Sequence, residues 1–260
     1  MTAGSLLIVG TGIKLVAEAG VAVEERIRAA EKVFFVAGDP AKATWLTQLN
    51  PQAVSLHSLY QPGKPRIQTY QEMVARILEP VRQGYRVCAV FYGHPGVFVW
   101  PSHEAIRQAR AEGYTAEMLP GVSAEDCLFA DLEMDPLATG CQRFEATNFL
   151  LYNRPFDPTA VLVLWQIGVI GEAAFPPERA DSRGLSILTE RLLDHYPPDH
   201  EVIIYEAAQY AVLKPRIERR PLRDLPQAAV SPISTLCVPP LPLPRLDPQM
   251  QALLFPKRPG

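Results

Sequence analysis

A loop rich in glycine and proline, residues 92–98 (YGHPGVF), directly follows an apolar run, residues 87–91 (VCAVF). The apolar run is typical of a buried strand, and a capped helical pattern begins at Ser102. In an open α/β sheet, small molecules bind outside the carboxyl ends of the strands, and glycine lets the backbone approach them closely. The loop therefore predicts a ligand site. A tight turn without a ligand is an equally good interpretation, because Gly and Pro are common in such turns.

The order of strand, turn and helix recurs along the chain, which predicts an α/β fold with mostly parallel strands. Residues 5–9 predict the first strand, which ends at Gly10-Thr11-Gly12. Over residues 70–83, apolar side chains recur every three or four positions and Gly84 follows, so this stretch predicts the clearest helix of the chain. Ser123 and the acidic residues after it resemble a capping box that opens another helix.

The length of 260 residues allows two modest domains, and we place a boundary near the turn at Pro120. The expected division is an N-terminal α/β domain (1–118), a C-terminal α/β domain (119–240) and a proline-rich tail (241–260). The second half predicts strands over residues 160–167, 201–205 and 234–238 and a helix over 185–195. In the tail we expect extended chain and no folded element, because proline is so frequent there.

Composition excludes several classes of function. The formal net charge of -3 gives no basic field, so we expect no nucleic-acid partner. The longest apolar stretch, residues 160–171, is too short to cross a membrane and contains Gln166, so we expect no membrane association and a cytoplasmic location. The four cysteines are scattered and indicate small buried apolar side chains, and neither they nor the histidines have metal-ligand spacing. We therefore expect no metal site.

Nucleotide motifs are also absent from the sequence. The third glycine of a dinucleotide-binding G-x-G-x-x-G motif would fall at position 15, which is Leu15. The chain has neither a phosphate-binding G-x-x-x-x-G-K-[ST] loop nor a G-x-S-x-G nucleophile elbow. The sequence therefore does not support a nicotinamide cofactor or the commonest hydrolase mechanisms.

One segment, residues 57–70, carries several groups capable of acid–base chemistry. If a helix begins near Pro65, Arg66 and Tyr70 lie four residues apart on one face, and the preceding loop brings Tyr60 beside them. Arginine suits a developing oxyanion, and a phenol donates a proton or, if its pKa is perturbed, accepts one. The residues alone favour a simpler interpretation, in which Tyr70 begins the core face of its helix and Arg66 is a surface charge.

Five motifs taken together are more specific than any one of them. They are residues 9–12 (VGTG), 92–98 (YGHPGVF), 120–125 (PGVSAE), 165–168 (WQIG) and 232–236 (PISTL). In order and spacing they resemble the tetrapyrrole methylase superfamily of S-adenosylmethionine-dependent methyltransferases, over residues 1–240. Within it, the second and third motifs resemble the borosin-type peptide backbone α-N-methyltransferases. The first motif continues as Gly12-Ile13-Lys14, where corrin-type methylases have a Gly-Pro-Gly continuation.

The resemblance implies two α/β domains with S-adenosylmethionine in the cleft between them. It also implies a catalytic set of Tyr60, Arg66 and Tyr70, which reverses the simpler interpretation given above. The residues it implies for cofactor binding are Tyr92, His94, Pro95, Val97, Phe98, Ser123, Ala124, Gln166, Ala207, Ser234 and Thr235.

Methylation of a backbone amide is difficult because the nitrogen lone pair is delocalised into the carbonyl. The resemblance implies that Arg66 and one tyrosine stabilise charge on the carbonyl oxygen while the other tyrosine accepts the amide proton. We assign the proton acceptor to Tyr60 and the positioning role to Tyr70. The short proline-rich tail favours a precursor peptide supplied in trans, and the resemblance implies an interlocked homodimer. Two alternatives remain, a small-molecule tetrapyrrole or corrin methylase and a catalytically silent peptide-binding homologue.

Overall fold

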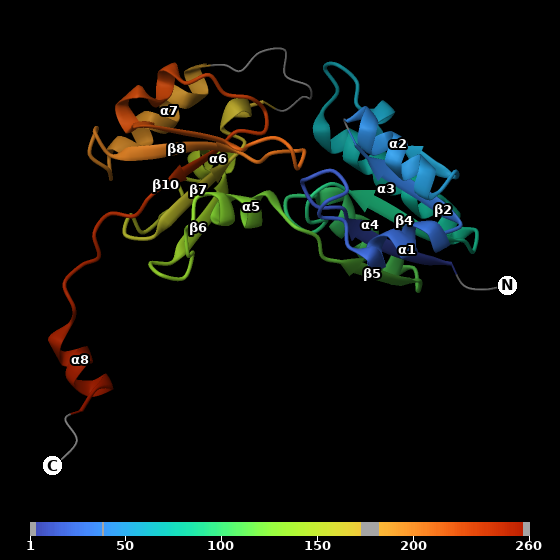
Figure 1. Ribbon diagram of the computed structural model, residues 1–260, viewed down its shortest axis with the longest axis horizontal. Coiled ribbons are helices and arrows are strands. Elements are labelled where there is room, and N and C mark those ends of the chain that lie inside the picture. The colour runs from blue at the N-terminus through green and yellow to red at the C-terminus, as the bar shows by residue number, and fades with distance from the viewer. Residues whose placement is uncertain (1–3, 38, 173–181, 257–260) are drawn as a thin grey trace. The chain divides into compact units, whose positions relative to one another are not determined.

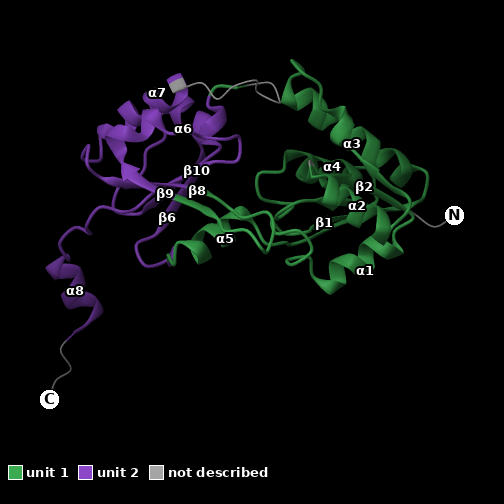
Figure 2. Cartoon of the chain, turned by 45° about the horizontal axis from the view of Figure 1, so that its top comes forward, with its two compact units in different colours: residues 1–134, 171–180, 205–217 green, residues 135–170, 181–204, 218–260 purple. Residues whose placement is uncertain are grey.

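The computed structural model describes residues 4–37, 39–172 and 182–256 (Figure 1). Contacts divide the chain into two compact units (Figure 2). Unit 1 contains residues 1–134, 171–180 and 205–217, and unit 2 contains residues 135–170, 181–204 and 218–260. Each unit is built on one five-stranded sheet with helices, so the predicted α/β class is confirmed. The domain division expected at residue 118 stays a prediction.

The sheet of unit 1 has the strand order β3-β2-β4-β1-β5, and every neighbouring pair in it is parallel. The carboxyl ends of its strands therefore meet at one edge. Its strands are β1 (Ser5–Gly10), β2 (Lys32–Val36), β3 (Ala53–Ser55), β4 (Arg86–Phe91) and β5 (Thr115–Leu119). The accompanying helices are α1 (Val21–Ala29), α2 (Pro40–Leu49), α3 (Arg66–Arg82), α4 (Trp100–Ala111) and α5 (Ala124–Asp131).

Both faces of the central part of this sheet are buried, which explains the continuous apolar runs in β1, β2 and β4. In β4, the side chains of Val87 and Ala89 join a core formed with α3 and α4. The intervening Cys88 and Val90 join a second core formed with α1 and α2. Because successive side chains of a strand point to opposite faces, α3 and α4 cover one face and α1 and α2 cover the other.

The sheet of unit 2 has the order β6-β7-β10-β8-β9 and is mixed, since β6 pairs with β7 in parallel and β10 pairs with β7 antiparallel. One face packs on α6 and α7 around Phe149, Leu162, Leu188 and Leu236. The elements are β6 (Cys141–Glu145), α6 (Ala146–Leu151), β7 (Val161–Trp165), α7 (Ser182–Leu193), β8 (Glu201–Glu206), β9 (Arg216–Pro221) and β10 (Thr235–Val238).

Local sequence signals explain where the helices begin and end. The predicted helix over residues 70–83 corresponds to α3, which starts four residues earlier, after Pro65, and ends before Gly84 at φ +93°. The predicted capping box exists, and it pairs Ser123 with Asp126 at the start of α5. The helix expected from Ser102 begins two residues earlier, at Trp100.

The expectation that the tail has no folded element is wrong. A helix, α8 (Pro248–Leu254), begins where the Asp247 carboxylate accepts hydrogen bonds from the amides of Gln249 and Met250. A proline in the first helical turn removes no hydrogen bond, because that amide has no partner inside the helix. The preceding residues 239–247 have no regular secondary structure, as expected for proline-rich chain.

The cysteines are free thiols. The prediction that they are buried is confirmed for Cys88, Cys127 and Cys237, whereas Cys141 is partly exposed. Burial raises the pKa of the Cys88 thiol to about 12. Among the described residues, no helix is long and apolar enough to cross a membrane, and no group of three or more metal-ligating side chains occurs.

Two buried tyrosines test the energetics of the fold. The Tyr205 hydroxyl donates a hydrogen bond to Asp131 Oδ2 at 2.7 Å, whereas the buried Tyr196 hydroxyl has no partner among the described residues. We expect Tyr205→Phe to lower the free energy of unfolding by about 2 kcal/mol, the value of a hydrogen bond to a charged group. The matched Tyr196→Phe removes a buried hydroxyl that makes no hydrogen bond to the described residues, so it should not lower the free energy of unfolding. Urea unfolding measures both, and equal losses would contradict the interpretation.

Candidate active site

Tyr60, Arg66 and Tyr70 lie together in unit 1. Arg66 is the first residue of α3, and Tyr70 follows one helical turn later on the same face. Tyr60 follows the short 3-10 helix η1 (His57–Leu59), and its amide donates to the His57 carbonyl at 3.1 Å. The preceding loop thus places the Tyr60 side chain beside α3, where it hydrogen-bonds Tyr70.

The protonation state of Tyr60 follows from these surroundings. Its pKa is raised well above the ordinary value of a phenol, first by burial and then by Tyr70 and Tyr92. The positive charge of Arg66 acts in the opposite direction and lowers this pKa. At neutral pH, Tyr60 is therefore a neutral phenol that donates a hydrogen bond.

Two aromatic residues extend this group. Tyr70 stacks on Trp100, the first residue of α4, with ring centroids 6.3 Å apart and ring planes 21° apart. Tyr92, directly after β4, exposes 55% of its surface. Protein atoms nevertheless crowd its phenol enough that lost solvation raises its pKa, and Tyr70 adds to this shift. The tyrosine group therefore joins α3, α4 and the end of β4.

Three glycines allow the loops after β1, β4 and β5 to meet. A Cβ atom at Gly10 would lie 2.2 Å from the Gly93 carbonyl oxygen and 2.6 Å from Pro95 Cδ. A Cβ atom at Gly121 would lie 2.6 Å from the same carbonyl oxygen. Gly12 and Gly93 also exchange backbone hydrogen bonds across the junction. Gly10 and Gly93 are buried, so these glycines let the three loops pack backbone against backbone at the carboxyl edge of the sheet.

The loop after β4 is held in one conformation by its own side chains. His94 Nδ1 accepts a hydrogen bond from the Gly96 amide at 2.9 Å, and His103 Nε2 lies 2.9 Å from the Gly96 carbonyl oxygen. Phe98 has φ +60°, a strained conformation for a residue with a side chain, and exposes 60% of its surface. Such strain gathers at functional sites. The predicted ligand residues Tyr92, His94, Pro95, Val97 and Phe98 all belong to this segment.

Three further predicted residues also lie in unit 1. Ser123 and Ala124 lie at the start of α5, where the Ser123 hydroxyl donates to Asp126 at 2.6 Å. Ala207 belongs to a segment held beside the loop after β1, since the Leu15 amide donates to the Gln209 carbonyl at 2.9 Å. Within the same segment, the Tyr210 hydroxyl donates to Asp39, which caps α2.

Gln166, Ser234 and Thr235 form a separate group in unit 2. The Ile167 amide donates to the Ser234 carbonyl at 3.1 Å, so the loop after β7 lies against the start of β10. Gln166 has φ +61° and shares the strain seen at Phe98. A Cβ atom at Gly168 would lie 2.0 Å from the Ser231 carbonyl oxygen, so this loop also requires a glycine where its backbone packs closely.

Sequence reasoning missed Lys42 and Trp100. Lys42 is 8% exposed, and its ammonium group donates to the Ile13 carbonyl at 2.9 Å and lies 5.8 Å from the centre of the Tyr92 ring. Burial lowers its pKa, while Asp39 and Glu18 act in the opposite direction. No motif surrounds Lys42. For Trp100 the sequence offered one signal, its position two residues after the loop of residues 92–98.

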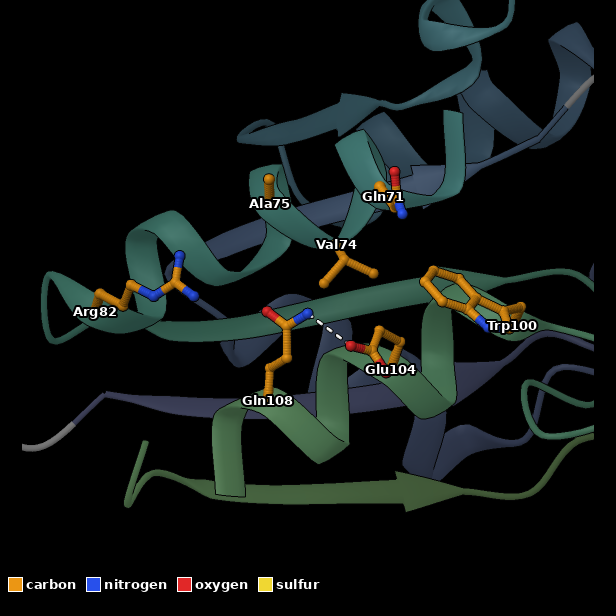
Figure 3. Close-up of a pocket in the computed structure, with 7 residues that line it drawn as sticks. All are labelled: Gln71, Val74, Ala75, Arg82, Trp100, Glu104 and Gln108. Atoms are coloured by element: carbon orange, nitrogen blue, oxygen red, sulfur yellow. Dashed lines mark hydrogen bonds between the residues drawn. The ribbon is translucent and has the colours of Figure 1, made fainter. Parts of the chain in front are cut away.

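A groove of about 330 Å³ lies between α3 and α4 in unit 1 (Figure 3). Figure 3 shows Gln108 donating to Glu104 from the α4 side, at 2.7 Å, with Val74 and Gln71 on α3. The groove contains none of the predicted catalytic or cofactor residues, and Trp100 links it to Tyr70. Its lining residues are Gln71, Val74, Ala75, Arg82, Trp100, Glu104 and Gln108.

Comparison with known proteins adds a family and relatives. A family model described as Tetrapyrrole (Corrin/Porphyrin) Methylases matches residues 5–226. The chain is 44% identical over 255 residues to a protein of Gymnopus fusipes named methyltransferase/ribosomally synthesized cyclic peptide gymnopeptides precursor, covering 96% of this chain and 60% of that protein. It is 43% identical over 242 residues to the corresponding omphalotin A precursor of Omphalotus olearius, covering 92% and 58%. The chain thus spans about 60% of the length of such relatives.

Solved structures share the fold. Uroporphyrin-III-C-methyltransferase from Thermus thermophilus has a TM-score of 0.66 at 19% identity, covering 92% of this chain and 93% of that one. Cobalt precorrin-4 methyltransferase has a TM-score of 0.63 at 16% identity, covering 90% and 94%. At identities this low, the similarity shows a shared fold alone.

The three-loop junction can be tested by adding one methyl group. In Gly10→Ala, the new Cβ meets backbone and a proline ring, neither of which can move cheaply. We expect a lower thermal midpoint and a loss of S-adenosylmethionine affinity of at least about tenfold. Gly20→Ala is the control, because no atom lies within 4 Å of a Cβ there. Calorimetric titration measures both variants, and unchanged binding by Gly10→Ala would contradict a ligand at this junction.

Proposed function

The chain belongs to the tetrapyrrole (corrin/porphyrin) methylase family, and on that premise we propose that it methylates backbone amides of a ribosomal precursor peptide, iteratively and with S-adenosylmethionine. Relatives 40–44% identical carry names that join a methyltransferase to a ribosomally synthesized peptide precursor. The observation that carries the proposal is the group formed by Tyr60, Arg66 and Tyr70. We propose that the peptide reaches the site as a separate chain and that the enzyme is an interlocked homodimer.

The residues at the strand-end loops suit the proposed methyl donor. S-adenosylmethionine supplies an electrophilic methyl group on a sulfonium ion. The junction at Gly10, Gly93 and Gly121 holds the loop after β4 at the edge of the sheet, and the exposed rings of Tyr92 and Phe98 on that loop offer aromatic faces that attract a cation. The further residues proposed to contact the donor are His94, Pro95, Val97, Ser123, Ala124, Gln166, Ala207, Ser234 and Thr235.

The catalytic group suits an amide substrate. An amide nitrogen becomes nucleophilic when it loses its proton, because the imidate then has an in-plane lone pair on nitrogen and shares its negative charge with the carbonyl oxygen. Arg66 and Tyr70 would stabilise this charge by hydrogen bonding. Tyr60 would accept the proton as the nitrogen gains the methyl group, so the N–H bond would break as the N–C bond forms. The bond from the methyl group to the sulfonium sulfur would break in the same transfer, which would leave a neutral thioether.

The raised pKa of Tyr60 makes deprotonation a requirement of this mechanism. Tyr60 is a phenol at neutral pH and must lose its proton before it can accept the amide proton. The same shift makes the phenolate, once formed, a stronger base. Arg66 therefore has two effects, since its charge also lowers the pKa of Tyr60.

Removing the arginine tests the proposed chemistry. We expect Arg66→Ala to reduce methylation by about 100-fold or more, as when an oxyanion-stabilising donor is lost, while donor binding persists. Arg76→Ala is the control, since Arg76 lies on α3 in an exposed ion pair with Glu79. The readout is mass spectrometry of a peptide co-expressed as a separate chain, with fragmentation to locate methyl groups. Donor binding without peptide methylation by the wild-type chain would favour a small-molecule methylase, and no donor binding a silent homologue.

The pH dependence tests the role of Tyr60. Below the raised pKa of Tyr60, the phenolate fraction grows about tenfold per pH unit, so the rate should rise from pH 7 through pH 9.5 without levelling off. Tyr60→Phe should leave a small rate that lacks this rise. Single-turnover rates at saturating donor measure the profile. A wild-type rate that is flat above pH 8 would exclude Tyr60 as the proton acceptor.

A further inference from the structure

A partly buried lysine closes the loop that carries Tyr60. The Lys64 ammonium group donates to the Leu59 carbonyl at 3.1 Å and to Glu72 Oε2 at 2.5 Å. Leu59 immediately precedes Tyr60, and Glu72 lies on α3. The Lys64 side chain is 11% exposed, so this ion pair is shielded far more than one on an open helix face. One side chain thus ties both ends of the Tyr60 loop to α3.

The tip of the loop has little other means of holding its position. Leu59 and Tyr60 pack against the core that includes α3, but Gln61, Pro62 and Gly63 are exposed and contribute little apolar burial. Gly63 has φ +73°, and the Lys64 amide donates to the Gln61 carbonyl at 3.1 Å, which forms a tight turn. The turn fixes the local path of the chain, and the Lys64–Glu72 bridge ties this turn to α3.

The bridge and the catalytic group engage different sides of α3. Arg66 and Tyr70 are four residues apart and share one face, whereas Glu72 shares its face with Gln68, whose amide lies 3.5 Å from Glu72 Oε1. The loop is therefore held by the core packing of Leu59 and Tyr60, by the Tyr60–Tyr70 hydrogen bond and by the Lys64 bridge. The bridge is the polar tie that does not involve the reactive hydroxyl, so it persists when that hydroxyl exchanges partners.

We propose that Lys64, through Glu72 and the Leu59 carbonyl, is a positioning residue that holds Tyr60 against Tyr70 and Arg66. This inference rests on the proposed function, since Tyr60 is the proton acceptor there. Lys64 touches no reacting atom. Misplacement of a catalytic group by about 1 Å costs up to about 100-fold in rate.

The test compares three variants of the full chain. Lys64→Met keeps the aliphatic stem and removes the donor; we expect kcat to fall about 10- to 100-fold while KM for S-adenosylmethionine stays unchanged. Lys64→Arg keeps both donors within reach and should recover most of the rate. Arg76→Met removes an exposed ion pair from the same helix and should change nothing. An unchanged kcat in Lys64→Met, or no recovery in Lys64→Arg, would overturn the proposal.

A second readout separates positioning from general destabilisation. Tyr60 is faced by Tyr70 and Arg66 of α3, by Tyr92 after β4 and by His57, whose ring centroid lies 5.6 Å away. Burial, and after it Tyr70 and Tyr92, raise the pKa of Tyr60, so loosening the loop should expose the phenol to water and lower this pKa toward 10. The difference in phenolate absorbance between each variant and its Tyr60→Phe counterpart measures this pKa. An unshifted pKa in Lys64→Met would overturn the proposal.

The same readout distinguishes the two possible failures. Phenolate absorbance and hydrogen exchange of residues 59–65 need no substrate, so both respond to the bridge even if the chain methylates no peptide. A wild-type chain without peptide methylation, combined with faster exchange in Lys64→Met, would refute the proposed function and leave the bridge as a structural tie. Normal methylation with unchanged exchange in Lys64→Met would refute the positioning role alone.

Discussion

The close approach of three backbone loops is the constraint on which unit 1 depends. Parallel strands bring the ends of β1, β4 and β5 to one edge, but the loops meet only because Gly10 and Gly121 carry no side chain and Gly93 adopts φ +70°. Tyr92 immediately precedes Gly93, so the same junction fixes the aromatic ring that faces Tyr60 and Tyr70. The backbone edge and the tyrosine group are therefore two results of one packing requirement.

How far the sequence predicts the fold depends on how local each signal is. The apolar stripe of α3 and the capping box of α5 are complete within about a dozen residues, and both predictions were accurate. The sequence did not lead us to expect α8, because frequent prolines usually break helices. Asp247 followed by Pro248 is nevertheless a strong signal for the start of a helix. The same signal, Asp39 followed by Pro40, opens α2, whose apolar residues form no clear stripe and which was also missed.

The candidate site shows the same limit in chemical terms. Residue types and spacing placed Arg66 and Tyr70 on one helical face, and the loop geometry placed Tyr60 beside them. Spacing could not predict the stack of Tyr70 on Trp100, thirty positions away, or the approach of Lys42 to Tyr92. Spacing also could not predict the pKa of Tyr60, because that pKa depends on burial by elements that follow later in the sequence.

The electrostatics of the tyrosine group give Arg66 a role that changes along the proposed reaction. Before reaction, its charge lowers the pKa of Tyr60 and so favours formation of the phenolate. As negative charge develops on the substrate carbonyl, Arg66 pairs with that charge and its effect on Tyr60 weakens. The pKa of Tyr60 then rises at the moment when the amide nitrogen must lose its proton. One guanidinium group therefore helps to form the base early and leaves it more basic when the proton is transferred.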